Sequence, residues 1–126
     1  MKILDANMIL RFLLRDDETS ANFVKNLIKT ETVTILPEII AEVVYVLTKV
    51  YRYERIKTAT GITSFLNCQN VVTEKCDVVL KALQYYGNTS LDFVDCLLCA
   101  YHTIAGYEIC TFDKKLNNLI KRESES

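Results

Sequence analysis

A strand leads directly into a helix in the stretch Thr32-Val33-Thr34-Ile35-Leu36-Pro37-Glu38-Ile39-Ile40-Ala41-Glu42. Residues 32–36 are mostly β-branched, which is typical of a strand. Pro37 suits the first turn of a helix, because the N–H that proline lacks would have no partner there. The apolar run after Pro37 predicts a helix that extends to about Tyr51.

Short β-type runs alternate with longer helical patterns on both sides of this stretch. The expected strands are residues 2–5, 32–36, 71–72 and 107–112, and the expected helices are residues 7–14, 18–29, 37–51, 56–67, 74–86, 91–105 and 114–121. This alternation predicts an α/β fold of three layers (α/β/α), in which helices cover both faces of a central parallel sheet. In such sheets ligands bind at the carboxyl ends of the strands.

Length and composition fit one compact domain. The chain has 126 residues, of which 50% are hydrophobic, and contains no linker-like stretch. We expect a single domain over residues 1–126, with a polar, frayed end from about residue 122. No apolar run approaches the roughly 18 residues of a membrane span, and Asp5 comes too early for a signal peptide. A cytoplasmic protein is therefore expected.

The net charge of −1 argues against general nucleic-acid binding, because the chain has no bulk positive field. It does not exclude a metal-dependent nuclease, in which bound ions supply the positive charge at the phosphate.

The chain contains five cysteines, an odd number that argues against a disulfide framework. Cys96 and Cys99 form a C-x-x-C pair, which is found in redox and zinc sites. They lie in an apolar helical pattern without a second C-x-x-C, and His102 is the only histidine. We interpret both thiols as buried and reduced, and His102 as structural.

Four carboxylates occupy positions where a soluble protein would normally place an apolar residue: Asp5, Glu42, Asp95 and Asp113. A carboxylate that is desolvated without compensation costs several kcal/mol or more, so a buried one is paired, protonated or bound to a metal. The same runs contain no comparable set of cations. We therefore expect these four acids to be buried around a divalent metal.

Each acid also has a simpler interpretation. Asp5 and Asp113 follow predicted strands, which places them at the ligand-binding edge, but each could instead cap the next helix. Glu42 could share a solvated stripe with Glu38, although few positions nearby are polar.

Asp92 and Asp95 lie three residues apart, on one face of a helix. Thr89-Ser90-Leu91-Asp92 reads as a capping box, which explains Asp92 through the positive end of the helix. Asp95 lies one turn further in, where capping does not explain it. Asp95 is therefore the stronger catalytic candidate and Asp92 a secondary metal ligand.

Four segments together resemble PIN domains, in particular the VapC-type toxins of toxin–antitoxin pairs. These segments are Leu4-Asp5-Ala6-Asn7-Met8-Ile9-Leu10-Arg11-Phe12-Leu13-Leu14, Glu42-Val43-Val44-Tyr45-Val46-Leu47, Asp92-Phe93-Val94-Asp95-Cys96-Leu97-Leu98 and Thr111-Phe112-Asp113-Lys114-Lys115-Leu116. They occur in family order and at family-like spacing along nearly the whole chain. Many relatives have a small residue where this chain has Cys96, which implies a difference in packing.

The resemblance implies a ribonuclease that cleaves RNA phosphodiester bonds with Mg²⁺ or Mn²⁺ held in an acidic pocket. It also implies a homodimer that a small cognate antitoxin inhibits. Carried over, the catalytic and metal-binding acids are Asp5, Glu42, Asp95 and Asp113. The supporting residues are Asn7, Thr111 and Arg11, the last as a phosphate or structural contact.

Three other functions remain open at this point. The chain could be a PIN scaffold that binds RNA or protein with little catalysis, although it keeps all four acids. It could be a phosphotransfer module, although it has Asp5-Ala6-Asn7 where such phosphatases have D-x-D. It could also cleave DNA, because an acidic site does not read the sugar.

Overall fold

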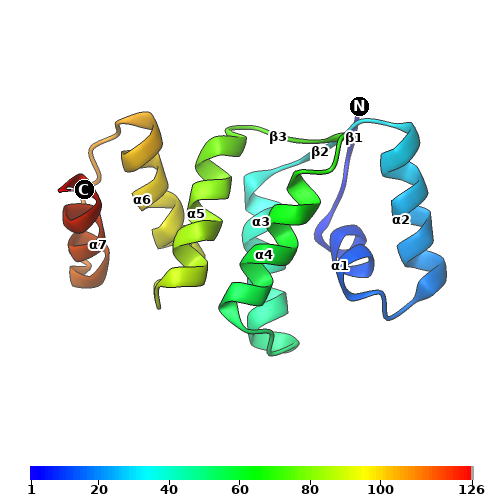
Figure 1. Ribbon diagram of the computed structural model, residues 1–126, viewed down its shortest axis with the longest axis horizontal. Coiled ribbons are helices and arrows are strands. Elements are labelled where there is room, and N and C mark those ends of the chain that lie inside the picture. The colour runs from blue at the N-terminus through cyan, green and yellow to red at the C-terminus, as the bar shows by residue number, and fades with distance from the viewer. Residues whose placement is uncertain (126) are drawn as a thin grey trace.

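The computed structural model describes residues 1–125 and consists of three short strands and seven α-helices (Figure 1). The strands are β1 (Lys2–Ile3), β2 (Val33–Ile35) and β3 (Val71–Thr73). The helices are α1 (Ala6–Leu14), α2 (Glu18–Thr30), α3 (Pro37–Tyr45), α4 (Arg55–Leu66), α5 (Cys76–Asn88), α6 (Phe93–Ala105) and α7 (Lys114–Ser124). A π-helical turn, η1 (Val46–Val50), continues α3.

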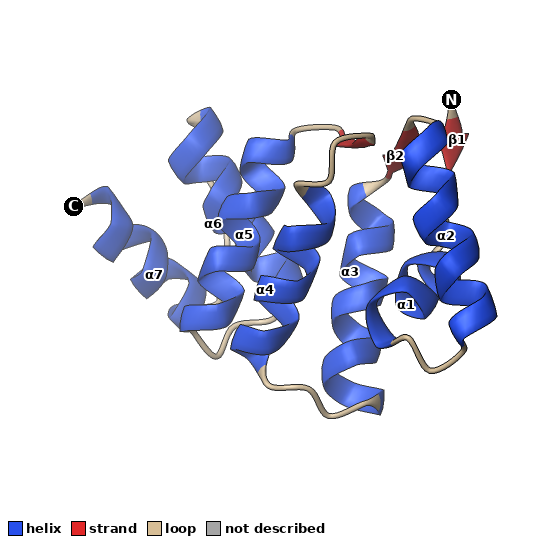
Figure 2. Ribbon diagram, turned by 45° about the vertical axis from the view of Figure 1, so that its right-hand side comes forward, coloured by secondary structure: helices blue, strands red, loops and turns tan. Residues whose placement is uncertain are grey.

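The strands form one parallel sheet in the order β1-β2-β3 (Figure 2). In the central strand, Val33 and Ile35 are completely buried and Val33 pairs with both Lys2 and Val71. Val33 and Ile35 lie two residues apart, so both side chains are buried on the same face of the sheet, whereas Thr34 on the other face is half-buried. The predicted α/β fold with a central parallel sheet is confirmed.

The helix that begins at Pro37 changes its hydrogen-bonding pattern after Tyr45. Thr48 donates its hydroxyl to the carbonyl oxygen of Val44 at 2.8 Å, and the N–H of Tyr51 reaches the carbonyl of Val46. A threonine hydroxyl that bonds back to a helix carbonyl perturbs the local ladder. The helix predicted to end near Tyr51 therefore ends there, but its last turn is wider than an α-helical turn.

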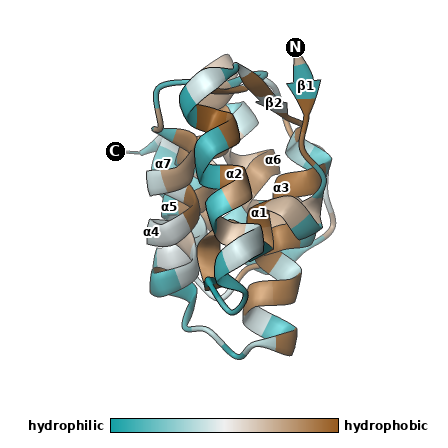
Figure 3. Ribbon diagram, turned by 90° about the vertical axis from the view of Figure 1, so that its right-hand side faces the viewer, coloured by the Kyte–Doolittle hydropathy of each residue, from teal (hydrophilic) through white to brown (hydrophobic). Residues whose placement is uncertain are grey.

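The helices are arranged in a row along the longest axis of the molecule, from α2 and α1 at one end to α6 and α7 at the other (Figure 1). Their buried side chains form one core cluster, with Ile62 and Phe65 of α4 and Leu83 of α5 among the fully buried residues. Individual helices carry both hydrophobic and hydrophilic stretches (Figure 3), as expected of helices that bury one face. No helix within residues 1–125 has the length and apolar character that crossing a bilayer requires.

Two expectations about the C-terminal part were wrong. Residues 107–112, predicted as a strand, have no strand partner in the described chain. Helix α7 continues to Ser124, beyond residue 122, where a frayed end was expected. The Ser124 hydroxyl lies 2.9 Å from Nε2 of His102, which ties the end of α7 to α6. The remaining residue of the expected frayed end, residue 126, lies outside the described part.

Candidate functional site

Asp5 lies at the junction between the first strand and the first helix. It follows Leu4 directly after β1, and its Oδ1 accepts a hydrogen bond from the N–H of Met8 at 2.9 Å. The side chain is exposed, so the expectation that Asp5 is buried was wrong. Asp5 therefore combines the two placements considered for it, a strand end and a helix cap.

Glu42 lies on the exposed face of α3. Ile40, Val43 and Val44 bury the opposite face of this helix, and Glu42 itself is exposed. The expectation that the apolar sequence around Glu42 forces its burial was therefore wrong. Tyr45, one turn further along, is 62% exposed, which shows that apolar residues also occupy the outer face of α3.

Asp95 differs from the other candidate acids because it lies partly buried in the first turn of α6. Burial raises the pKa of the Asp95 carboxyl above its ordinary value, and the negative charges of Asp113 and Asp92 raise it further. All of the named charges that act on Asp95 are acidic. Asp95 therefore faces a negative environment that a cation would relieve.

Asp92 occupies the N-cap position of α6, but its side chain makes no capping hydrogen bond. The hydroxyl of Thr89 instead accepts from the N–H of Leu91 at 3.3 Å. A capping box would make Thr89 the N-cap and Asp92 the third residue of the helix, so this interpretation was wrong, although Asp92 does lie at the positive end of α6. The Asp92 carboxylate is exposed and free to interact with a ligand.

Asp113 caps α7, because its Oδ1 accepts from the N–H of Leu116 at 2.8 Å. The hydroxyl of Thr111 accepts from the N–H of Asp113 at 3.0 Å, which fixes the turn before the helix. Asp113 is exposed, contrary to the expected burial. Thr111 therefore contacts the backbone of Asp113, and its supporting role in the site stays a prediction.

Arg11 is held by protein groups. Its guanidinium donates to Oδ2 of Asp16 at 2.7 Å and to the hydroxyl of Tyr51 at 3.4 Å. These are structural contacts, and a contact of Arg11 with phosphate stays a prediction. Asn7 is exposed in the first turn of α1, two residues after Asp5.

The cysteines and the histidine have structural surroundings. Cys96 and Cys99 are buried free thiols, and burial raises the pKa of Cys96 to about 11. Nδ1 of His102 lies 2.8 Å from the carbonyl oxygen of Tyr107. These contacts agree with the interpretation of the two thiols and of His102 as parts of the packing.

The structure brings only some of the candidate acids together. Asp92, Asp95 and Asp113 interact electrostatically where α6 and α7 begin, whereas Asp5 lies beside α1 toward the opposite end of the molecule (Figure 1). Within residues 1–125, no three Asp, Glu, His or Cys side chains are close enough to hold a metal ion. Within the part of the chain that the structure describes, the candidate acids therefore do not form a complete metal site.

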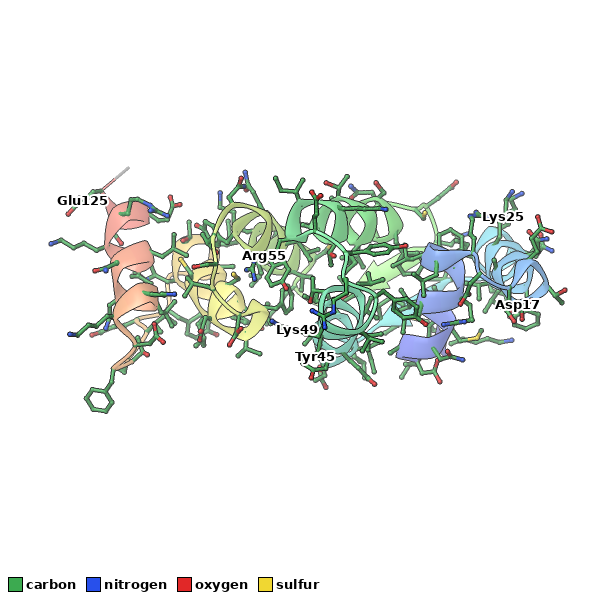
Figure 4. The ribbon with its side chains drawn as sticks, turned by 90° about the horizontal axis from the view of Figure 1, so that it is seen from below. Asp17, Lys25, Tyr45, Lys49, Arg55 and Glu125 are labelled. Carbon is green, nitrogen blue, oxygen red and sulfur yellow. The ribbon has the colours of Figure 1, made fainter. Side chains whose placement is uncertain are left out.

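Arg55 is a positioning residue that sequence reasoning did not single out (Figure 4). Its Nε donates to the carbonyl oxygen of Tyr86 at 2.9 Å, and its terminal nitrogen donates to the carbonyl of Leu91. The guanidinium lies 3.6 Å from the centre of the Tyr86 ring. Arg55 thus fixes the backbone immediately before Asp92. Its partners are backbone carbonyls 31 and 36 residues away, which leave no pattern in the sequence.

A groove of about 220 Å³ runs between α3 and the start of α6. One wall includes Tyr45 and Lys49, both labelled in Figure 4, and the other includes Asp92 and Val94. The groove therefore places an aromatic ring, an aliphatic side chain, a cation and a candidate acid beside one another.

Comparison with known proteins gives two matches that span nearly the whole chain. A family model described as PIN domain matches residues 2–121. A protein described as VapC ribonuclease, from Aquifex aeolicus (strain VF5), is 28% identical over 124 residues, which cover 94% of this chain and 92% of that protein. No solved structure matches the chain significantly. The family match includes all four positions of the candidate acids.

Proposed function

The chain belongs to the PIN domain family, and we propose that it is an endoribonuclease that hydrolyses RNA phosphodiester bonds and serves as the toxin of a toxin–antitoxin pair. The observation that carries this proposal is the PIN domain match over residues 2–121, a span that includes Asp5, Glu42, Asp95 and Asp113. The relative from Aquifex aeolicus is described as a VapC ribonuclease, which supports the same activity.

The proposal includes Mg²⁺ or Mn²⁺ as the cofactor. Hard divalent cations take carboxylate oxygens as ligands, and Asp5, Glu42, Asp95 and Asp113 are the proposed catalytic and metal-binding acids, with Asp92 secondary. The described part of one copy does not hold three such groups close together, so we assign no catalytic step to a metal within a single copy.

The residues of the chain itself have separable tasks in this proposal. Burial and the negative charges of Asp113 and Asp92 raise the pKa of Asp95, and a cation bound beside Asp95 would offset these charges. Arg55 and Thr111 hold the backbone before Asp92 and Asp113, respectively, so that these acids keep their positions. Phosphate approaches an acidic surface of this kind only when a cation offsets the repulsion.

A test of the proposal is RNA cleavage by purified protein with Mg²⁺, with Mn²⁺ and with excess chelator. We expect cleavage with either ion, products with a 5′-phosphate and a 3′-hydroxyl, and no cleavage in chelator. Asp95→Asn is the matched control, because it removes the charge and keeps the shape. Cleavage at full rate in excess chelator, or by Asp95→Asn, would contradict the proposal.

A PIN scaffold that binds RNA or protein without cleaving it is the second candidate. This candidate is favoured because, within residues 1–125, no three acids lie close enough to share a metal ion. RNA binding that persists with no cleavage under any of the three ion conditions would select this alternative. DNA offered under the same conditions tests whether the activity is restricted to RNA.

A further inference from the structure

Positive charge is concentrated on helix α7. Residues 114–122 contain three lysines, one arginine and no acid, whereas the whole chain has a net charge of −1. The helix begins directly after Asp113, whose negative charge acts on Asp95. A surface that attracts phosphate therefore begins beside the proposed catalytic acids.

A polar cleft lies between α7 and the turn that joins α5 to α6. Helices α5 and α7 both pack on α6 (Figure 1). One wall of the cleft is residues 88–91, the other wall carries Lys115, Asn118 and Arg122, and the volume is about 300 Å³. These three residues follow one another at spacings of three and four, which places them on one helix face. We call this space the α7 cleft.

Both walls of the α7 cleft begin next to a candidate acid. Leu91 directly precedes Asp92, and Lys115 lies two residues after Asp113. The negative charges of Asp92 and Asp113 both raise the pKa of Asp95, so the three carboxylates lie within electrostatic reach of one another. An RNA strand with a phosphate at these acids can therefore continue directly into the cleft.

The polar side chains of the α7 cleft have unused hydrogen-bonding groups. Within residues 1–125, the side chains of Ser90, Lys115 and Asn118 make no hydrogen bond or ion pair, and all three are exposed. Asn88 donates from Nδ2 to the carbonyl oxygen of Gln84 at 2.8 Å, which leaves its amide oxygen available. The cleft thus offers a cation, two amides and a hydroxyl to a ligand.

The lining of the α7 cleft suits a hydrophilic strand better than a protein surface. Its two apolar residues, Leu91 and Leu119, are only 6% and 3% exposed and belong to the core. A protein partner usually anchors aromatic or aliphatic side chains on apolar surface. RNA instead offers phosphates, sugar hydroxyls and base edges, which pair with cations, hydroxyls and amides.

The cations of the α7 cleft face little opposing charge. No carboxylate of the described chain lines the cleft itself. A smaller hollow of about 110 Å³ shares part of the lining and extends along α5 to Lys81, and Glu123 lines only this hollow. A phosphate in the α7 cleft would therefore meet Lys115 and Arg122 without a neighbouring acid in the lining.

We propose that the α7 cleft holds the RNA strand on one side of the scissile phosphate, and in that respect the assignment rests on the proposed function. Lys115 and Arg122 bind backbone phosphates, and Asn88 and Asn118 contact base edges. The phosphate contacts hold any sequence, whereas the amide contacts discriminate between bases. The arrangement explains how a chain without a bulk positive field retains RNA: its cations are placed where the strand leaves the acids.

The phosphate contact is tested by RNA binding in excess chelator, where no cleavage is expected. The probe is a fluorescein-labelled single-stranded RNA of about ten nucleotides, and its anisotropy measures Kd. Lys115→Gln should raise Kd about threefold or more and should lower the slope of log Kd against log salt by about 0.7. Lys115→Arg keeps the charge and should keep the affinity.

Lys121→Gln is the matched control. It removes the same charge from an exposed position of the same helix, but Lys121 lies outside the lining of the α7 cleft. We expect its Kd to stay within about twofold of the natural value, because salt screens exposed charges that do not touch the ligand. An equal loss of affinity in Lys115→Gln and Lys121→Gln would indicate general attraction to α7 and would overturn the proposal.

Three further results would also overturn it. One is unchanged RNA affinity in Lys115→Gln, and another is no binding of the RNA by the natural protein at low salt. The third is a lower Tm in Lys115→Gln together with the weaker binding. The Lys115 side chain makes no contact within the described chain, so its loss should leave the Tm unchanged unless the residue has a structural role.

The base contact is tested with RNAs of one base each. Asn118→Ala should change the ratio of the Kd values for oligo(A) and oligo(U) by about threefold or more, because an amide reads base edges. The salt slope should stay the same, because no charge is removed. Asn26→Ala, at an exposed position of α2, is the control and should leave the ratio unchanged. An unchanged ratio in Asn118→Ala would contradict base contact by this residue.

The inference and the proposed function fail separately. If the natural protein cleaves no RNA under any ion condition, the proposed function fails, and the binding comparison still decides the α7 cleft. If it cleaves RNA, Lys115→Gln should raise KM and leave kcat nearly unchanged, because the residue holds the strand away from the reacting phosphate. A lower kcat with unchanged Kd would place Lys115 at the reacting phosphate and contradict its assignment to the cleft.

Discussion

At the scale of single residues, Asp92 and Asp95 lie on the same helix face but differ in burial: Asp92 is exposed and Asp95 is partly buried. Asp92 makes no capping hydrogen bond, so Asp92→Asn should change the free energy of unfolding by less than about 0.5 kcal/mol and keep most RNA cleavage. Asp95→Asn should lower cleavage by at least about a hundredfold, because the electrostatic stabilisation of a transition state is usually a large term. Cleavage rates at saturating metal measure both. The opposite order of effects would show that Asp92 is the principal ligand of α6.

The raised pKa of Asp95 has a definite effect on stability. Because the folded pKa lies above the unfolded one, ionisation of Asp95 costs folding free energy. The folded protein carries no such cost below the ordinary carboxyl pKa of about 4, and loses stability as the pH rises through the folded pKa. In chelator, Asp95→Asn should therefore have a higher Tm than the natural protein at pH 7, and the difference should shrink toward pH 4. A lower Tm for Asp95→Asn at pH 7 would contradict this assignment.

Local sequence patterns predicted where the acids lie relative to the helices and strands, but they did not predict that most of these acids are exposed. Asp5 and Asp113 fall where strand and helix signals meet, and both cap helices as one interpretation required. The burial of Glu42 was predicted from apolar neighbours, but an apolar run does not show which of its residues face outward. Tyr45, at 62% exposure, occupies the face that was expected to be covered.

At the scale of elements, replacing Gly61 or Gly106 with alanine should change stability in opposite directions. Gly61 lies within α4, where an added Cβ would meet no atom within 4 Å. Gly61→Ala should therefore stabilise the protein by roughly 0.5 to 1 kcal/mol. Gly106 ends α6 with a φ of 79°, so Gly106→Ala should destabilise by about 1 to 2 kcal/mol. Urea denaturation measures both, and a destabilised Gly61→Ala would show that α4 is more crowded than described.

Arg55 links α4 to the turn that precedes α6. Arg55→Ala removes hydrogen bonds to two carbonyls and the contact with the Tyr86 ring, and should cost about 2 to 3 kcal/mol. Arg55→Lys should recover only part of this, because an ammonium group cannot span two acceptors as a planar guanidinium does. Lys25→Ala, at an exposed position of α2, is the control and should change stability by less than about 0.5 kcal/mol. Equal stability of Arg55→Lys and the natural protein in urea would show that charge alone suffices.

Most elements were predictable because their signals are local. The β-branched run before Pro37, the helix stop at Gly106 and the amphipathic helices all lie within a few residues of their predicted bounds. Residues 107–112 have equally strong strand chemistry and still form no strand. A helix satisfies its own backbone, whereas a strand needs an edge supplied by another part of the structure. The sequence of a segment does not specify where that edge is.

At the scale of the whole molecule, the distribution of acids and aromatic side chains suits a partner with basic and apolar residues. Glu42, Asp92 and Asp113 are exposed, and Tyr45 forms part of the groove beside Asp92. Tyr51, which directly follows the η1 turn, is 42% exposed. The fork of an arginine pairs well with carboxylates. We therefore propose that the cognate antitoxin inserts basic side chains among the acids and lays apolar side chains along the groove.

The acids and the groove beside Tyr45 should contribute differently to antitoxin binding and to inhibition. Replacing the antitoxin's basic residues with glutamine should weaken inhibition more than binding, because the apolar contacts remain. Tyr45→Ala should weaken binding by about tenfold or more, as the loss of an aromatic anchor usually does. Phe23→Ala is the matched control, because Phe23 is also 62% exposed but lies on α2, toward the other end of the molecule, and its loss should leave binding unchanged.

The candidate antitoxin is the product of the gene next to that of this protein. Titration calorimetry of its binding, with and without Mg²⁺, measures these effects and the competition with metal. Weaker binding in Mg²⁺ is expected, because the ion and the basic side chains neutralise the same acids. If no neighbouring gene product binds, and expression of the protein alone leaves growth and RNA intact, the toxin assignment fails while the PIN fold stands. If Phe23→Ala weakens binding as much as Tyr45→Ala does, the antitoxin lies on the opposite end of the molecule, and its basic residues cannot act at Asp92.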